Sequence, residues 1–128
     1  MSYYINKIKQ GGFQETIAEV KEALSKEGFG VLSEISIDEK LKEKLGVDFR
    51  KYIILGACNP AYAFKALQHE DKIGTMLPCN VIVQQLDEKN VEVAAIDPVA
   101  SMMAVENEAV AGVAGDIKAK LGRVINSL

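Results

Sequence analysis

A continuous apolar run, YIILGAC at residues 52–58, passes directly into Asn59 and Pro60. Such a run is typical of a central strand that is buried on both faces. The side chain of asparagine can cap a helix, and the fixed φ of proline suits the first helical position. The junction therefore predicts a central strand followed at once by a helix, with Asn59 as the cap and an end near Asp71.

The remaining segments alternate between strand-like and helix-like spacing of apolar residues, with short turns between them. The predicted strands are 2–9, 29–37, 52–58 and the two arms of a hairpin over 80–97, and the predicted helices are 13–28, 38–46, 59–71 and a last helix up to Leu128. The order is β-α-β-α-β-α-β-β-α. We expect one domain over residues 1–128, an α+β two-layer sandwich whose mostly antiparallel sheet has about five strands with helices packed on it.

Charge and composition disfavour several classes of partner. The 15 Lys and Arg residues are interspersed with 18 Asp and Glu residues, for a net charge of −3, and there is no tryptophan. Such a chain lacks the basic patch and the aromatic platform that nucleic-acid binding requires. No signal peptide and no membrane-spanning run is apparent, so we expect a cytoplasmic protein without a membrane or nucleic-acid partner. Two cysteines in a reducing compartment are expected to be free thiols.

The two cysteines each sit at the end of a predicted element. Cys58 ends the apolar strand at the start of a helix, where the helix dipole favours a thiolate and lowers the pKa of the thiol. Cys79 opens a later strand. The two thiols lie close together if the segment 73–78 runs back along the preceding helix, and at opposite ends if it only turns a corner. The length of that segment favours the first arrangement.

The sequence therefore predicts that a small ligand, a metal ion or a sulfur species binds near Cys58 and Cys79. Asn59 and Asn80 are expected to orient the ligand, and Asp97 with Met102 to close the pocket. A thioether and two thiolates are soft ligands, which would suit a soft metal. No cofactor is indicated, and without an evident general base the residues do not argue for any catalysed reaction.

The only histidine, His69, lies at the far end of its predicted helix from Cys58. That position argues against a Cys-His-Cys metal site and against a paired thiol and base, and the cysteine spacing matches no zinc pattern.

The alternative is a non-catalytic homodimeric interaction module in which both cysteines are core residues. The run VASMMAV at 99–105 and the last helix carry more apolar surface than one short sheet can bury. Gly112 and Gly115 weaken a helix, and they are easier to explain if another backbone approaches closely. Labelling of the thiols only after denaturation would favour this alternative, and fast, pH-dependent labelling of the native protein near neutrality would favour the ligand site.

Four stretches resemble the domain of unknown function 302 family over essentially the whole chain. They are ALSKEGFGVLSEI, YIILGACNPAYAFKAL, IGTMLPCNVIV and IDPVASM, and the CNP and LPC motifs are the specific ones. The resemblance implies an α+β sandwich that tends to form a homodimer. It implies no activity.

Overall fold

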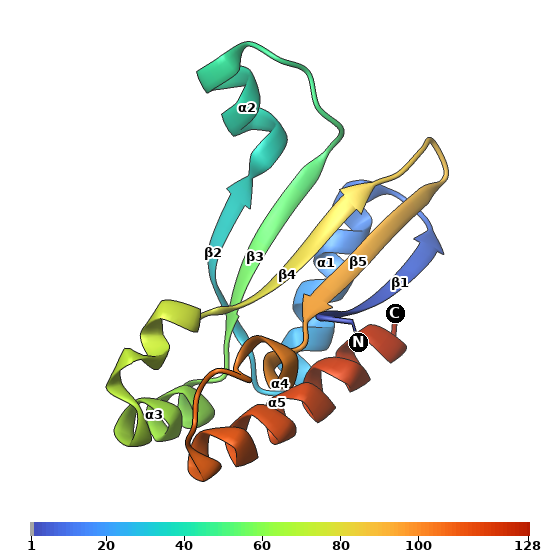
Figure 1. Cartoon of the computed structure of the whole chain (residues 1–128). Coiled ribbons are helices and arrows are strands. Elements are labelled where there is room, and N and C mark those ends of the chain that lie inside the picture. Colours follow the sequence, from blue (N-terminus) through green and yellow to red (C-terminus); the bar gives the residue numbers. More distant parts are fainter. Residues whose placement is uncertain (1) are drawn as a thin grey trace.

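A five-stranded antiparallel sheet forms the centre of the computed structural model, which describes residues 2–128 (Figure 1). The strands are β1 (Tyr4–Gln10), β2 (Gly30–Ser36), β3 (Tyr52–Cys58), β4 (Cys79–Gln85) and β5 (Asn90–Ile96). Their order across the sheet is β1-β5-β4-β3-β2, and every neighbouring pair is antiparallel. The predicted α+β sandwich is confirmed.

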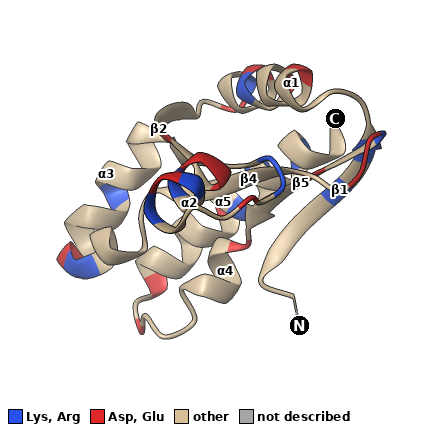
Figure 2. Ribbon diagram, turned by 90° about the horizontal axis from the view of Figure 1, so that it is seen from above, with Lys and Arg blue, Asp and Glu red and all other residues tan. Residues whose placement is uncertain are grey.

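Two long helices cover one face of this sheet, and the other helices lie at its ends. The helices are α1 (Phe13–Lys26), α2 (Ile37–Leu45), α3 (Pro60–His69), the 3-10 helix η1 (Asp71–Met76), α4 (Pro98–Ser101) and α5 (Glu108–Asn126). The pair that covers the face is α1 and α5. Helix α2 buries no residue and carries many of the charges, at the opposite end of the sheet from α3 (Figures 1 and 2). No helix within residues 2–128 is long and apolar enough to span a membrane.

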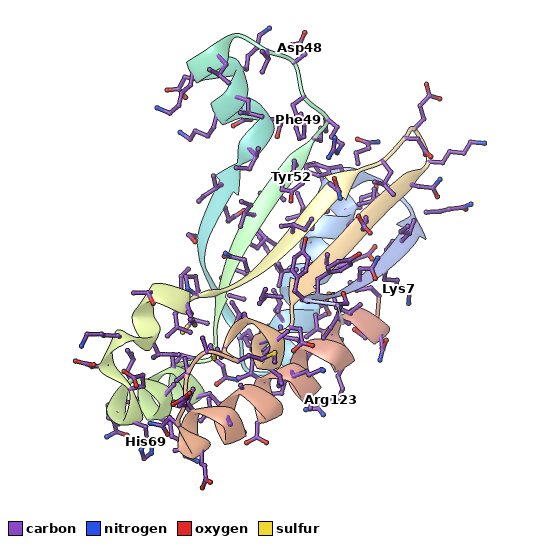
Figure 3. All side chains as sticks on the ribbon, viewed as in Figure 1. Lys7, Asp48, Phe49, Tyr52, His69 and Arg123 are labelled. Carbon is purple, nitrogen blue, oxygen red and sulfur yellow. The ribbon has the colours of Figure 1, made fainter. Side chains whose placement is uncertain are left out.

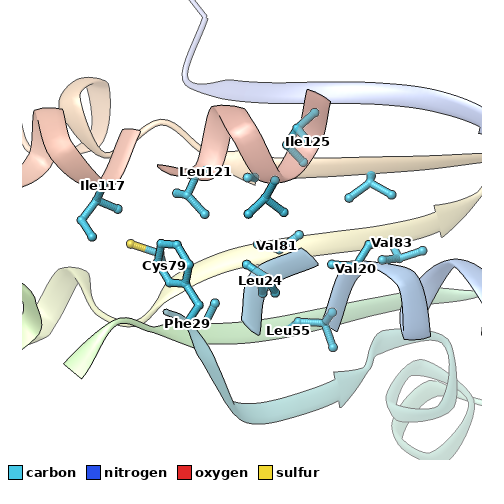
Figure 4. Close-up of a cluster of buried hydrophobic side chains, with 14 of the residues drawn as sticks. Val20, Leu24, Phe29, Leu55, Cys79, Val81, Val83, Ile117, Leu121 and Ile125 are labelled. Atoms are coloured by element: carbon cyan, nitrogen blue, oxygen red, sulfur yellow. The ribbon is translucent and has the colours of Figure 1, made fainter. Parts of the chain in front are cut away.

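The hydrophobic core lies between the two long helices and the sheet. Leu24 of α1 and Leu121 of α5 are fully buried against Leu55 and Val81 of the sheet (Figure 4). Each such leucine stabilises the fold by about 1.5–3 kcal/mol relative to an exposed side chain. The periodic apolar residues of the two helices thus hold both of them on the same face.

Strand β3 is an interior strand, as predicted, but it is not buried on both faces. It lies between β4, the middle strand, and the edge strand β2. Ile53, Leu55 and Ala57 are buried, but Ile54 on the alternate face is only half-buried. The prediction of burial on both faces is wrong, because the helices cover only one face of the sheet.

The uncovered face of the sheet, called the open face below, presents apolar side chains to solvent. Its apolar side chains are Tyr4, Ile8, Ile35, Ile54, Ile82 and Ile96, which the strand registers place on the same side. Tyr4, Ile8 and Ile35 are exposed, and the other three are half-buried. Asn6, Gln84 and Glu92 lie on this face as well and are joined by hydrogen bonds. In an antiparallel sheet one face is commonly solvated, and there polar residues would be the norm.

Candidate functional site

The two cysteines lie at the same end of the sheet. Strand β3 ends at Cys58, α3 and η1 return the chain, and β4 begins at Cys79. Ala57 pairs directly with Cys79 across the two antiparallel strands, so the Cα atoms of these two residues are about 5 Å apart. Of the two arrangements open to the sequence, the structure has the one in which the segment 73–78 runs back beside the helix.

A cavity of about 340 Å³ opens at this end of the sheet, and we call it the sulfur-lined cavity. Its wall comprises Phe29, Leu32, Ala57, Cys58, Asn59, Tyr62, Ala63, Ala66, Leu67, Gly74, Leu77, Pro78, Cys79, Pro98, Met102, Val113, Ala114 and Ile117. These residues come from the ends of β3 and β4, from α3 and η1, and from α4 and α5. The wall contains no Asp, Glu, Lys, Arg or His, so it suits apolar or polarisable groups rather than highly charged ones.

Cys79 is the more deeply buried of the two thiols, with 8% of its surface exposed. Its side chain lies beside Phe29 and near Ile117 (Figure 4). Burial raises the pKa of the Cys79 thiol to about 11, and the charge of Cys58 adds to the effect. Cys79 is therefore a neutral thiol at physiological pH.

Cys58 is half-buried at the junction of β3 and α3. It borders the cavity together with Cys79, and the two thiols are close enough for the charge of Cys58 to act on Cys79. The two cysteines thus differ in their access to solvent. That difference leaves Cys58 the more accessible thiol to a reagent in solution.

We predict that Cys58 reacts faster than Cys79 with a disulfide reagent such as dithionitrobenzoate. At pH 8 a thiol with a pKa of about 11 is only about one-thousandth thiolate, and the thiolate is the nucleophile. The variants Cys58→Ser and Cys79→Ser each leave one thiol, so that their rates can be compared in native protein. We expect Cys79 to react at least about 100-fold more slowly than a free cysteine. Equal rates for the two variants would contradict the burial described above.

Asn59 borders the cavity but does not cap α3. It occupies the N-cap position, yet its side chain accepts no hydrogen bond from the first turn. Its Nδ2 instead donates to the carbonyl oxygen of Glu27 over 3.2 Å. The predicted cap is wrong, because the end of α1 presents a backbone acceptor to this side chain. Asn59 therefore ties α3 to the end of α1.

Two substitutions at Asn59 distinguish this tie from a cap. Asn59→Ala is expected to lower the free energy of unfolding by about 0.5–1.5 kcal/mol, the usual value of one hydrogen bond. Asn59→Asp should lose at least as much, because a carboxylate cannot donate to the Glu27 carbonyl. Urea unfolding of both variants measures these changes. If Asn59 acted as a cap, aspartate would preserve the stability, since the two residues cap equally well.

Asn80 does not lie in the sulfur-lined cavity. Because side chains alternate along a strand, Asn80 points to the face opposite Cys79. It is exposed there and borders a separate hollow beside Tyr52 and Gln84. The structure therefore does not bring it together with the two cysteines.

Asp97 also lies outside the cavity wall and has a structural environment of its own. Its carboxylate accepts hydrogen bonds from the backbone N–H groups of Val99 and Ala100 at the start of α4. Lys118 of α5 forms an ion pair with it at 2.9 Å. Burial alone would raise the pKa of Asp97, but the hydrogen bonds and the charge of Lys118 outweigh it and hold the pKa below the usual value.

Of the two consecutive methionines, only Met102 lines the cavity. Met102 follows α4 and packs against the core, whereas Met103 is 67% exposed. The structure thus brings Met102 together with Cys58, Asn59 and Cys79, and leaves out Asn80 and Asp97.

His69 lies at the end of α3 that is distant from β3, as predicted (Figure 3). It is exposed, and its backbone carbonyl accepts a hydrogen bond from Asn107. Within residues 2–128, no three His, Cys, Asp or Glu side chains gather in a way that could hold a metal ion.

The helix residues that leave room for the cavity were not predicted as part of the site. Ala66 of α3 and Ala114 of α5 are both buried in its wall, and Ile117 lies one turn beyond Ala114. Small side chains at inward positions of two neighbouring helices leave space that larger ones would fill. The alanines are visible in the sequence on the apolar stripes of the two helices. Only the packing of α3 on α5 shows that they face a common space.

Comparison with known proteins agrees with this fold. The family description "Domain of unknown function DUF302" matches residues 5–128. The crystal structure of an uncharacterized conserved DUF302 protein from Bacillus stearothermophilus is similar, with a TM-score of 0.90 and 31% identity over 98% of each chain. No curated protein sequence matches the chain. Since the family match spans nearly every residue, this chain belongs to the DUF302 family.

Proposed function

We propose that this domain binds a small ligand, apolar or polarisable, in the sulfur-lined cavity. The observation that carries the proposal is the cavity itself, in whose wall both cysteines of the chain stand. Its volume of about 340 Å³ falls within the ~300–1,000 Å³ of small-molecule sites. A wall without charged side chains would reject a highly charged ligand, which would lose its hydration without compensation.

We also propose that the protein resides in a reducing, cytoplasmic compartment. Both cysteines are unbridged, and in an oxidising compartment two free thiols that border one cavity would be prone to oxidation.

Fluorescence titration with N-phenyl-1-naphthylamine tests the proposal. This uncharged dye emits strongly only when it leaves water, so its emission should rise and saturate at one dye per chain. Alkylation of Cys58 should then reduce the signal, because the added group lies at the border of the cavity. An emission that stays at the level of free dye would contradict the proposal.

We also propose that the chain forms a homodimer through the open face of the sheet. Tyr4, Ile8 and Ile35 leave apolar surface there that another copy could cover. Gly112 and Gly115 of α5 face open space, because no atom outside the adjoining residues and backbone of their own helix lies within 4 Å of an added Cβ, so they do not favour a particular neighbour. Light scattering should give about twice the 13.9 kDa of one chain, and Ile8→Glu should return the monomer mass. A monomer mass for the unmodified protein would contradict this second proposal.

A further inference from the structure

We propose that the ligand of the sulfur-lined cavity is a soft monovalent metal ion, Cu(I), bound by the sulfur atoms of Cys58, Cys79 and Met102. This inference rests on the proposed ligand-binding function and names the class of ligand. The three residues come from three separate elements, the end of β3, the start of β4 and the end of α4, and all three stand in the wall of the one cavity. Thiolates and thioethers are the ligands that select Cu(I).

The environment of Cys79 supports a ligand at this point. More than nine-tenths of its surface is buried, and no hydrogen bond to its sulfur accompanies that burial. The sulfur points away from β4 in the direction of Ile117, which also lines the cavity (Figure 4). The Cys79 thiol thus has no hydrogen-bond partner at the cavity. A metal ion bound there would supply a bonding partner for its sulfur.

The composition of the wall selects among metals. Zinc prefers four ligands in a tetrahedron, drawn from thiolates, imidazoles and carboxylates. The wall offers two thiols and one thioether but no histidine or carboxylate. Calcium and magnesium require several oxygen ligands, whereas the side-chain oxygens of the wall are only those of Asn59 and Tyr62. Three sulfur donors in an apolar surround therefore suit a soft monovalent ion such as Cu(I) better than these metals.

Binding releases two protons and leaves one negative charge. Each thiol loses its proton as its sulfur bonds to the metal, so that Cu(I) and two thiols give a bis-thiolate complex of charge −1, with Met102 as a neutral third ligand. Helix α3 begins at Pro60, two residues after Cys58, and its N-terminus carries about half a positive charge. The side chain of Asn59 does not cap that end, so the charge remains available to the complex.

Competition with bathocuproine disulfonate for Cu(I) tests the inference. The protein, kept reduced and free of oxygen, should withdraw one Cu(I) per chain from the coloured chelator complex. Cys58→Ser and Cys79→Ser should each weaken binding by at least about 100-fold, since loss of an outer-shell partner alone costs 10–100-fold. Met102→Leu should weaken it less, by about tenfold, and X-ray absorption at the copper edge should then count one sulfur fewer.

Met103→Leu is the matched control, because Met103 is adjacent in sequence but exposed and absent from the cavity wall. It should bind Cu(I) as the unmodified protein does. Circular dichroism verifies that each variant is folded. If Cys79→Ser does not fold, because it buries a hydroxyl group, Cys79→Ala replaces it in the binding measurement.

The outcomes separate this inference from the proposed function. If Cu(I) is withdrawn and displaces N-phenyl-1-naphthylamine, both stand. If the dye binds but the protein takes no Cu(I), or if Cys58→Ser and Cys79→Ser retain full affinity for it, the metal inference is overturned and the proposed function stands. Failure of both the dye and the metal to bind overturns both.

Discussion

The variant Ala114→Leu is expected to bind N-phenyl-1-naphthylamine at least about tenfold more weakly than the unmodified protein, a change of about 1.4 kcal/mol. Ala114 is buried in α5 and lines the sulfur-lined cavity, so a leucine there would extend into the space that the dye needs. Because protein side chains do not fill that space, the larger side chain should leave the thermal midpoint unchanged or raise it. Fluorescence titration and thermal unfolding measure the two effects.

Ala111→Leu is the control for this substitution. Ala111 lies on the same helix but is exposed, so the change in helix propensity and in volume is the same without any effect on the cavity. Dye binding by Ala111→Leu should equal that of the unmodified protein. The cavity would be disproved if Ala114→Leu kept full dye affinity and lost stability, because a closely packed site loses about 1–3 kcal/mol when extra methylenes are forced into it.

Asp97→Ala is expected to lower the free energy of unfolding by about 2 kcal/mol at pH 7. The substitution removes the cap of α4, worth about 0.5–2 kcal/mol, and the ion pair with Lys118, worth less than about 1 kcal/mol. The Asp97 side chain is 9% exposed, so water cannot replace these contacts fully. Lys118→Met removes the ion pair alone, and because Lys118 is about half exposed it should cost less than about 1 kcal/mol. Urea unfolding of the unmodified protein, Asp97→Ala and Lys118→Met measures these differences in the free energy of unfolding.

The contribution of Asp97 should depend on pH in a defined direction. Its pKa is lowered in the folded protein, so its stabilising effect is fully present above the unfolded pKa of about 3.9. The effect is lost as the pH falls through the lower folded pKa. The difference in stability between the unmodified protein and Asp97→Asn should therefore be constant from pH 5 to 8, within the ~5–8 range where proteins are usually most stable, and shrink below about pH 4. A difference that grows in acid would contradict the lowered pKa.

Local patterns in the sequence were enough for the fold. The apolar stripe of the last helix, from Val110 to Val124, is buried as its spacing predicts. The hairpin of β4 and β5 also follows from alternation and a polar turn. These elements follow from the spacing of apolar residues that are close in the sequence, and that spacing can be seen in a single sequence.

Contacts between distant segments account for what could not be predicted. The partner of Asn59 is a carbonyl 32 residues away, and the partner of Asp97 is a lysine on α5. Nothing in the flanking residues of either one identifies these contacts. The position of Asn80 could have been predicted, because side chains alternate along a strand and a buried Cys79 places its neighbour on the opposite face.

Chemical-shift mapping by NMR shows whether a ligand binds in the sulfur-lined cavity. At 13.9 kDa the chain is small enough for its backbone amides to be assigned and followed during a titration with N-phenyl-1-naphthylamine. We expect saturable shifts of the amide signals of Cys58, Ala66, Cys79 and Ala114, and no shift for Tyr52 on the other side of the sheet. Shifts confined to the open face, or none at all, would contradict ligand binding in the cavity.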